Sequence, residues 1–122
     1  MRKAYRQMSN QQLIDFLQTG GVLVDIRREE EWRLTGVVEG SILLTFFAAD
    51  GSSRPEAWLE QLNSLVAEDK PVALICRSGY RTSLICEYLG EVSSRPEVFN
   101  LTAGILGWLE ASLPVVTVAE TS

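Results

Sequence analysis

The chain has 122 residues, which fits one domain, and 46% of them are apolar, enough to bury a core without disulfide or metal staples. Its formal net charge of −5 and its scattered basic residues exclude a surface that tracks nucleic-acid phosphates. No stretch approaches the ~18 consecutive apolar residues of a membrane helix, and polar residues follow the basic N-terminus, so we expect a cytoplasmic protein without a membrane contact.

The first half of the chain alternates helix and strand signals. Ser9-Asn10-Gln11-Gln12 has the form of a capping box and predicts a short helix that Gly20-Gly21 ends. The apolar, β-branched run 22–26 predicts a buried strand. The charge run 27–31 predicts a turn or the first turn of a helix, which Gly36 breaks. A second strand is expected at 41–44.

The second half repeats this alternation. We expect Ser53 and Glu56 to cap a helix whose first turn holds Pro55. The elements expected after it are a strand at 71–75, a helix at 82–92, a strand at 98–101 and a helix at 103–113 that Pro114 stops. The tail 115–122 is expected to dock as a short extended piece or to fray.

Alternating strands and helices predict an α/β fold with a mainly parallel sheet of about four to five strands and helices on both faces. Residues 1–122 are expected to form this single domain, with 117–122 as a flexible tail. Ligands of such sheets bind at the carboxyl ends of the strands. Cys76 lies at one such end, where the apolar run Val72-Ala73-Leu74-Ile75 meets a predicted helix.

The loop that begins at Cys76 combines a thiol with groups that bind anions. A helix N-terminus and nearby guanidinium groups lower the pKa of a thiol and favour the thiolate nucleophile. Arg77 and Arg81 supply planar donor forks for oxyanions, and Gly79 permits the backbone angles of a tight loop. Ser78 adds a hydroxyl donor. Tyr80 is expected either to stack at the rim or to anchor the loop on the core.

The rest of the composition limits the chemistry. The chain has no histidine, so a thiol enzyme here must activate its cysteine through backbone dipoles and arginines. The second cysteine, Cys86, falls inside a predicted helix and is expected to be a buried core residue. Two cysteines make neither a disulfide framework nor a zinc site, and we expect no metal and no cofactor.

Three stretches together resemble the rhodanese-like, or sulfurtransferase, domain in its single-domain form. Cys76 to Arg81 matches the family's Cys-Arg-x-Gly-x-Arg active-site pattern. Val24-Asp25-Ile26-Arg27 followed by Glu30-Glu31-Trp32 is similar to its Asp-x-Arg…Glu-aromatic segment. Asn100 to Trp108 with Leu113-Pro114-Val115 is similar to its closing segment. The three occur in the family's order, and the resemblance spans about residues 8–116.

The resemblance implies a rhodanese-like fold and a sulfurtransferase mechanism. Cys76 would take a sulfane sulfur from a small anionic donor such as thiosulfate, become a persulfide, and pass the sulfur to cyanide or a thiol. A sulfur-carrier protein is a further partner that the family allows. Arg77, Ser78, Gly79, Tyr80 and Arg81 would bind the substrate. Asp25 and Arg27 would orient or brace the loop from the neighbouring strand end, and Glu31 would pair with Arg81.

Three alternatives stay open at this level. Cysteine-type phosphatases and arsenate reductases space cysteine and arginine as Cys-x5-Arg, whereas this chain has Cys-x4-Arg, with Thr82 at the sixth position. The shorter loop makes a smaller cradle that suits sulfur better than a tetrahedral phosphate. A non-catalytic rhodanese-like module that binds a partner or carries a signal is the second alternative. A redox pair of Cys76 and Cys86 is the third, although ten residues separate them.

Overall fold

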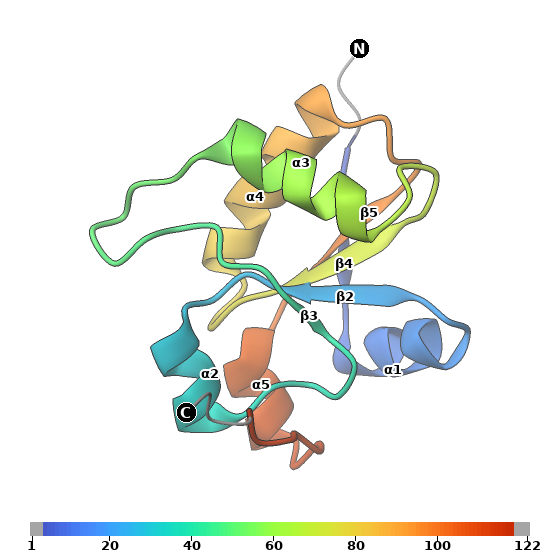
Figure 1. Cartoon of the computed structure of the whole chain (residues 1–122). Helices are drawn as coiled ribbons and strands as arrows, with labels where there is room; N and C mark the ends of the chain where they lie inside the picture. The colour runs from blue at the N-terminus through green and yellow to red at the C-terminus, as the bar shows by residue number, and fades with distance from the viewer. Residues whose placement is uncertain (1–3, 119–122) are drawn as a thin grey trace.

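A five-stranded parallel sheet forms the centre of the protein in the computed structural model, which describes residues 4–118 (Figure 1). The strand order is β1-β5-β4-β2-β3, and each neighbouring pair is parallel. The strands are β1 (Arg6–Met8), β2 (Val22–Asp25), β3 (Ile42–Leu43), β4 (Val72–Ile75) and β5 (Val98–Leu101). The helices are α1 (Asn10–Gln18), α2 (Glu29–Thr35), α3 (Pro55–Leu65), α4 (Tyr80–Val92) and α5 (Gly104–Glu110).

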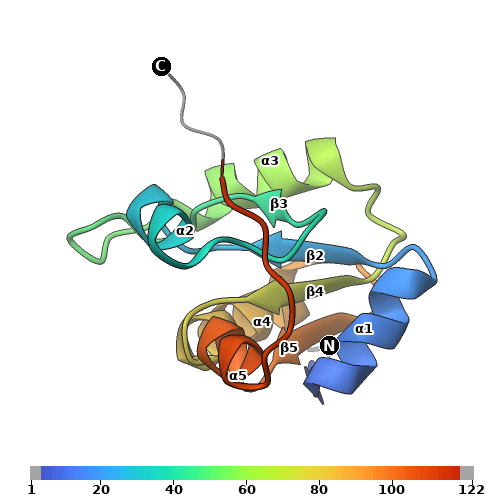
Figure 2. The same cartoon turned by 90° about the horizontal axis from the view of Figure 1, so that it is seen from below.

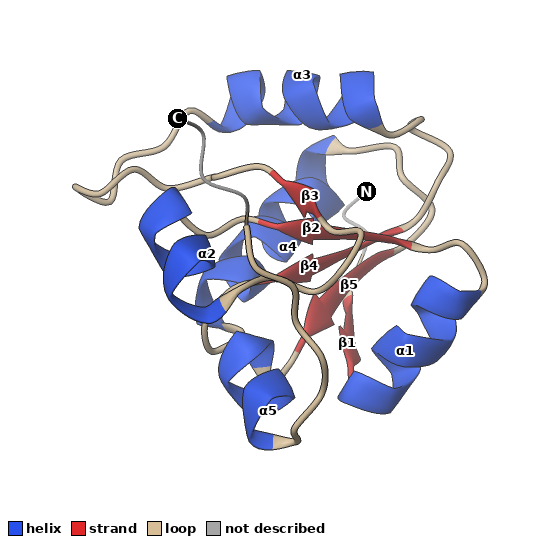
Figure 3. Cartoon of the chain, turned by 60° about the horizontal axis from the view of Figure 1, so that its bottom comes forward, coloured by secondary structure: helices blue, strands red, loops and turns tan. Residues whose placement is uncertain are grey.

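Helices cover both faces of the sheet, as Figure 3 shows with α3 on one side and α1 and α5 on the other. One core joins the sheet to α3 and α4 and contains Trp58 and Leu89. The other core joins it to α1 and α5 and contains Leu13 and Trp108. The shortest crossover helix, α2, buries none of its residues and follows the carboxyl end of β2. In the described residues, no helix is long and apolar enough to span a membrane.

The central position of β4 in the sheet explains why its sequence is a continuous apolar run. Every residue from Val72 to Ile75 is buried, and Cys76 beyond it is buried too. Alternate residues point to opposite faces, so Leu74 and Cys76 belong to the core under α4, whereas Ala73 and Ile75 belong to the core under α5. The thiol therefore lies directly after a strand that is covered on both faces.

The strand order reverses between β2 and β4. From β2 the chain adds β3 on one side and then returns to place β4 on the other, with β5 beyond it. The two strands are in register, with Asp25 beside Ile75. Ligands of open parallel sheets bind at the carboxyl ends of the strands where the order reverses. Here Ile26 and Arg27 follow the end of β2, and Cys76 follows the end of β4.

The predicted alternation of strands and helices is confirmed, and the structure corrects four details. Sequence analysis missed β1, an edge strand of three residues with one buried side chain. The expected cap of α3 at Ser53 is wrong, since Arg54 holds that position without a side-chain bond and Pro55 begins the helix. The helix α4 begins at Tyr80, two residues earlier than expected, and α5 ends at Glu110.

The end of the described chain docks on the fold. Figure 2 shows the C-terminal segment running back from α5 across the sheet towards α2. Val116 pairs with Val37 in an antiparallel bridge through two backbone hydrogen bonds of 2.8 and 2.9 Å. This confirms the extended docking expected for the tail as far as Val116. Residues 119–122 of the expected flexible tail lie outside the described residues.

Candidate active site

The loop 76–79 connects β4 to α4 and requires glycine at its last position. Gly79 is the N-cap of α4 and has φ +91°, a left-handed conformation that other residues rarely adopt. A Cβ at this position would lie 2.3 Å from the carbonyl oxygen of Thr102. The loop therefore turns against the end of β5, and only glycine fits between them.

The start of α5 fixes the loop from the other side. The backbone N–H groups of Ile105 and Leu106 donate to the carbonyl oxygens of Cys76 and Arg77, at 2.8 and 3.1 Å. Gly104 has φ +63°, and a Cβ there would lie 2.3 Å from the carbonyl oxygen of Arg77. The closing segment 100–108, which resembles that of the family, thus holds the backbone of the cysteine loop in place.

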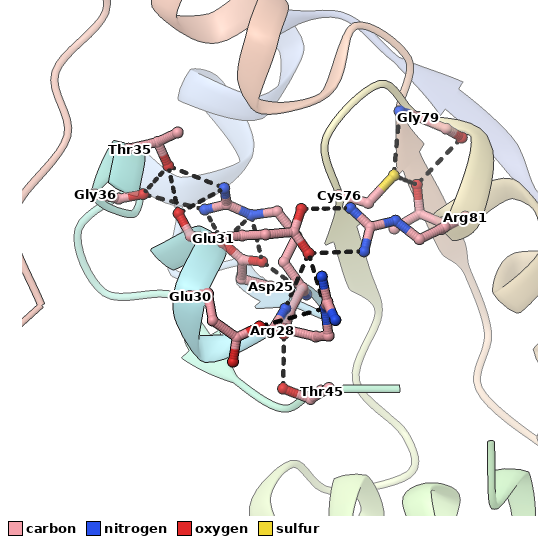
Figure 4. A network of polar contacts seen from close by, with 12 residues as sticks. Asp25, Arg28, Glu30, Glu31, Thr35, Gly36, Thr45, Cys76, Gly79 and Arg81 are labelled. Atoms are coloured by element: carbon pink, nitrogen blue, oxygen red, sulfur yellow. Dashed lines mark hydrogen bonds and ion pairs between the residues drawn. The ribbon is translucent and has the colours of Figure 1, made fainter. Parts of the chain in front are cut away.

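The sulfur of Cys76 lies inside this loop with two polar neighbours. The Gly79 N–H donates to Sγ at 3.2 Å, and the Thr82 hydroxyl lies 3.3 Å from Sγ, as the close-up in Figure 4 shows for Cys76 and Gly79. Cys76 and Thr82 are both fully buried. Within the described chain, the backbone N–H groups of Ser78, Tyr80 and Arg81 have no acceptor. These donors stand at the N-terminus of a 13-residue helix and can receive an anion.

The two arginines of the loop have different surroundings. Arg81 donates to both carboxylate oxygens of Glu31 in α2, at 2.9 and 2.7 Å (Figure 4), which confirms the expected pair. This hydrogen-bonded pair lowers the pKa of Glu31 despite its partial burial and raises the pKa of Arg81. Arg77 is exposed, and its guanidinium has no partner in residues 4–118. Arg77 is therefore free to meet an anion.

Asp25 and Arg27 form a buried ion pair at the end of β2. The Arg27 guanidinium is 1% exposed and donates to Asp25 at 2.9 Å. Its remaining donors go to α2, to the Thr35 hydroxyl at 2.9 Å and the Gly36 carbonyl at 3.1 Å. Within the described residues, Arg27 makes no hydrogen bond to the cysteine loop. It braces α2, and α2 supplies the Glu31 that holds Arg81.

The other residues expected at the site are exposed. Ser78 is exposed, and its side chain makes no hydrogen bond within the described residues. Tyr80 is 68% exposed, so its ring lies at the rim and the alternative of anchoring the loop on the core is wrong. The mouth of the site is thus formed by exposed polar and aromatic side chains, while its floor is buried.

Cys86 is buried in the core, as expected, and it differs from Cys76 in its electrostatic environment. Burial, and to a lesser degree the negative charge of Cys76, raises the pKa of Cys86 to about 12. Cys86 is therefore a neutral thiol at pH 7. Both cysteines are free, and no group of three or more potential metal ligands occurs in the part of the chain that the structure describes.

Sequence analysis missed a chain of three polar residues that begins at the sulfur. It gave no site role to Thr82, named as the start of a helix and the sixth position after Cys76, or to Asn100, named as part of a strand and of the closing segment. In the structure the Thr82 hydroxyl donates to the side-chain oxygen Oδ1 of Asn100, and Asn100 Nδ2 donates to Gln7 Oε1 at 3.0 Å. A polar residue inside an apolar strand was the available signal for Asn100, since a buried amide requires partners. Gln7 gave no signal.

Comparison with known proteins settles the family. The rhodanese-like domain matches residues 9–111, most of the chain. The chain belongs to the rhodanese-like domain family. Its match to a sulfurtransferase of Allochromatium vinosum is 32% identical and covers 78% of each chain. A thiosulfate sulfurtransferase GlpE of Haemophilus influenzae is 26% identical and matches over 93% of this chain and 97% of that one.

The fold of this rhodanese-like domain matches solved structures as well. The crystal structure of Rv0390 from M. tuberculosis superposes with a TM-score of 0.77 at 25% identity, over 94% of this chain and all of that one. The cysteine loop lies inside the matched family region. The expected rhodanese-like α/β fold is confirmed.

Proposed function

We propose that this rhodanese-like domain is a sulfurtransferase of the thiosulfate type that works through a persulfide on Cys76. One observation carries the proposal: the Cys76 sulfur lies at the reversal point of the sheet, receives the Gly79 N–H at 3.2 Å, and is flanked by Arg77 and by the fixed charge of Arg81. A thiolate beside a helix N-terminus and arginines is the state that attacks sulfur. The names of the relatives support the same chemistry.

The first half-reaction loads the cysteine. The Cys76 thiolate attacks the outer sulfur of thiosulfate, a new S–S bond forms, and the bond between the two sulfur atoms of thiosulfate breaks. The bonding pair leaves with sulfite, so the total charge of −3 is conserved. Arg77 and the open N–H groups at the start of α4 can stabilise the charge of the departing sulfite. Cys76 has no exposed surface, so the loop must open slightly for the donor to reach it.

The second half-reaction returns the thiolate. A nucleophile such as cyanide or a thiolate attacks the outer sulfur of the persulfide, and the S–S bond breaks with its electron pair on Cys76. Thiocyanate or a new persulfide leaves. Neither step needs a metal or an organic cofactor. We propose the cytoplasm as the compartment, because a free catalytic thiol requires reducing surroundings.

Intact mass spectrometry after incubation with thiosulfate tests the proposal. We expect the protein to gain one sulfur atom that cyanide then removes. Cys86→Ala is the matched control and should load normally, whereas Cys76→Ala should not load. No gain from thiosulfate, polysulfide or a persulfide donor would overturn the proposal. A biological role that survives Cys76→Ser would favour the non-catalytic module instead. Aryl-phosphate hydrolysis without sulfur loading would favour the phosphatase.

A further inference from the structure

A chain of three polar side chains leads from the edge strand β1 to the reactive sulfur. Gln7 in β1 accepts from the Asn100 amide nitrogen at 3.0 Å. Asn100 in β5 accepts from the Thr82 hydroxyl. Thr82 in α4 lies 3.3 Å from Cys76 Sγ. Thr82 and Asn100 are buried, at 0% and 2% exposure, so these contacts are shielded from water.

The carbonyl oxygen of Gly79 fixes the orientation of the Asn100 amide. That oxygen can only accept, and it lies 3.2 Å from the Asn100 Nδ2 atom. The Asn100 Oδ1 atom must therefore face Thr82, and Oδ1 can only accept as well. The Thr82 hydroxyl has two oxygen acceptors, Asn100 Oδ1 and, at 3.3 Å, the Gly79 carbonyl oxygen. The contact with Asn100 is the shorter one, so the single hydroxyl proton is directed mainly at Asn100 in the resting protein.

This arrangement determines whether the Thr82 hydroxyl acts as a hydrogen-bond donor or as an acceptor towards the sulfur. With its proton directed at Asn100, the Thr82 oxygen presents a lone pair to Cys76. A neutral thiol fits there, because its S–H can donate to that lone pair. A thiolate does not fit equally well, because it can only accept. It gains the Thr82 proton as a partner only if the hydroxyl rotates away from Asn100 and leaves a buried acceptor unpaired.

We propose that Thr82 is a positioning residue for Cys76 and that Asn100 competes with the sulfur for its hydroxyl proton. The role in sulfur transfer rests on the proposed function. When Cys76 ionises, its own proton leaves to solvent, and the Thr82 hydroxyl rotates towards Sγ with its O–H bond intact. When the persulfide forms, the charge moves to the outer sulfur, and the hydroxyl turns back to Asn100.

Other charged or titratable groups also interact with the Cys76 thiolate, and the substitutions used in the test must leave these groups unchanged. Arg81 and Cys86 interact with it from α4, and Glu31 from α2 is paired with Arg81. Asp25 at the end of β2 interacts with Arg81 in turn, and Arg77 is next to Cys76 in the loop. None of these charged groups makes a hydrogen bond to Asn100 or Thr82 within the described chain.

The pH dependence of Cys76 alkylation by iodoacetamide, followed by peptide mass in the full-length protein, tests the competition. In Asn100→Ala the hydroxyl loses its closest acceptor and keeps only Cys76 Sγ and the Gly79 carbonyl oxygen, both at 3.3 Å. The charged sulfur is the stronger acceptor of these two, so the midpoint of the profile should move to lower pH. Below the midpoint, alkylation should be about threefold to tenfold faster than in the wild type. In a Thr82→Val background, the same Asn100 substitution should give no acceleration. Equal acceleration in both backgrounds, or none in either, would overturn the proposal.

Three further variants make the result specific. Ser83→Ala removes the neighbouring hydroxyl of α4, which bonds to the Tyr80 carbonyl oxygen rather than to the sulfur, and should not change the profile. Thr82→Ser keeps the hydroxyl and should keep the response to Asn100→Ala. Asn100→Leu fills the space of the amide and replaces Asn100→Ala if that variant does not fold. It should accelerate alkylation in the same way. Alkylation needs no sulfur donor, so failure of this coupling and failure of persulfide loading are separate results.

Discussion

Glu31 and Arg81, which are 50 residues apart in the sequence, form a bidentate ion pair with N–O distances of 2.9 and 2.7 Å. The pair joins α2 to the first turn of α4, directly beside the cysteine loop. Arg81 is therefore a fixed positive charge, whereas Arg77 is exposed and unpaired within the described residues. We infer that Arg81 sets the electrostatic field of the site and that Arg77 contacts the anionic donor.

Glu31→Gln should destabilise the protein by about 1 kcal/mol at pH 7, because it removes one partner of a partly buried pair. The pair lowers the pKa of Glu31 from its ordinary value of 4.5. A lowered carboxyl pKa contributes stability that is present above that value and is lost as the pH falls through the lowered pKa. The difference between variant and wild type, measured by urea unfolding, should therefore shrink below about pH 4.

Glu29→Gln is the control for this prediction. Glu29 bonds to Arg33 on the exposed face of the same helix. It should change the free energy of unfolding by no more than a few tenths of a kcal/mol. Equal losses in the two variants would contradict the role given to the Glu31–Arg81 pair.

Arg77→Gln should raise the KM for thiosulfate about tenfold, since it removes a charge-assisted hydrogen bond to the donor. The thermal midpoint should not change, because the side chain is exposed and bonds to no described residue. Steady-state kinetics with cyanide as the acceptor measure the effect. Lys70→Gln removes a positive charge just before the amino end of β4, whereas the cysteine loop follows the carboxyl end, and it should leave the KM unchanged. A similar rise in both variants would mean that only the net charge matters.

Gly79→Ala should destabilise the protein by roughly 2–4 kcal/mol and abolish sulfur loading. The new Cβ would meet the Thr102 carbonyl oxygen at 2.3 Å, and the residue would be held at φ +91°. Gly51 has nearly the same φ, +86°, with nothing within 4 Å of its Cβ position. Gly51→Ala should therefore lower the free energy of unfolding by only about 1 kcal/mol, the cost of the backbone strain, and sulfur loading should be normal. Chemical unfolding and intact mass compare the two, and equal losses would show that the close approach to β5 is unimportant.

Iodoacetamide at pH 7–8 should label Cys76 in the native protein and leave Cys86 unlabelled. Burial raises the pKa of Cys86 to about 12, so almost none of it is thiolate in this range. In denaturant both cysteines should be labelled, which provides the internal control. Peptide mass mapping gives the result, and native labelling of Cys86 at a comparable rate would contradict its buried, neutral state.

Local sequence patterns were sufficient for most elements of the fold. The capping box at Ser9 is present in the structure, with the Gln12 N–H donating to the Ser9 hydroxyl at 3.1 Å. The buried run 72–75 is a strand because an apolar, β-branched segment suits a parallel sheet covered on both faces. The edge strand β1 was missed because it has three residues and its pairing with β5 exists only in the tertiary structure.

The sequence alone determined the chemistry that is available: one thiol at the carboxyl end of a buried strand, two arginines and a glycine beside it, and no histidine. Those features follow from residue order, because the loop residues are neighbours in the chain. Only the tertiary structure decided which distant groups act on that thiol. It directed Arg27 to α2, gave Glu31 to Arg81, placed Thr82 against the sulfur, and placed Asn100 against Thr82. These contacts depend on how parallel strands and their helices lie side by side, and no local pattern in the sequence encodes that arrangement.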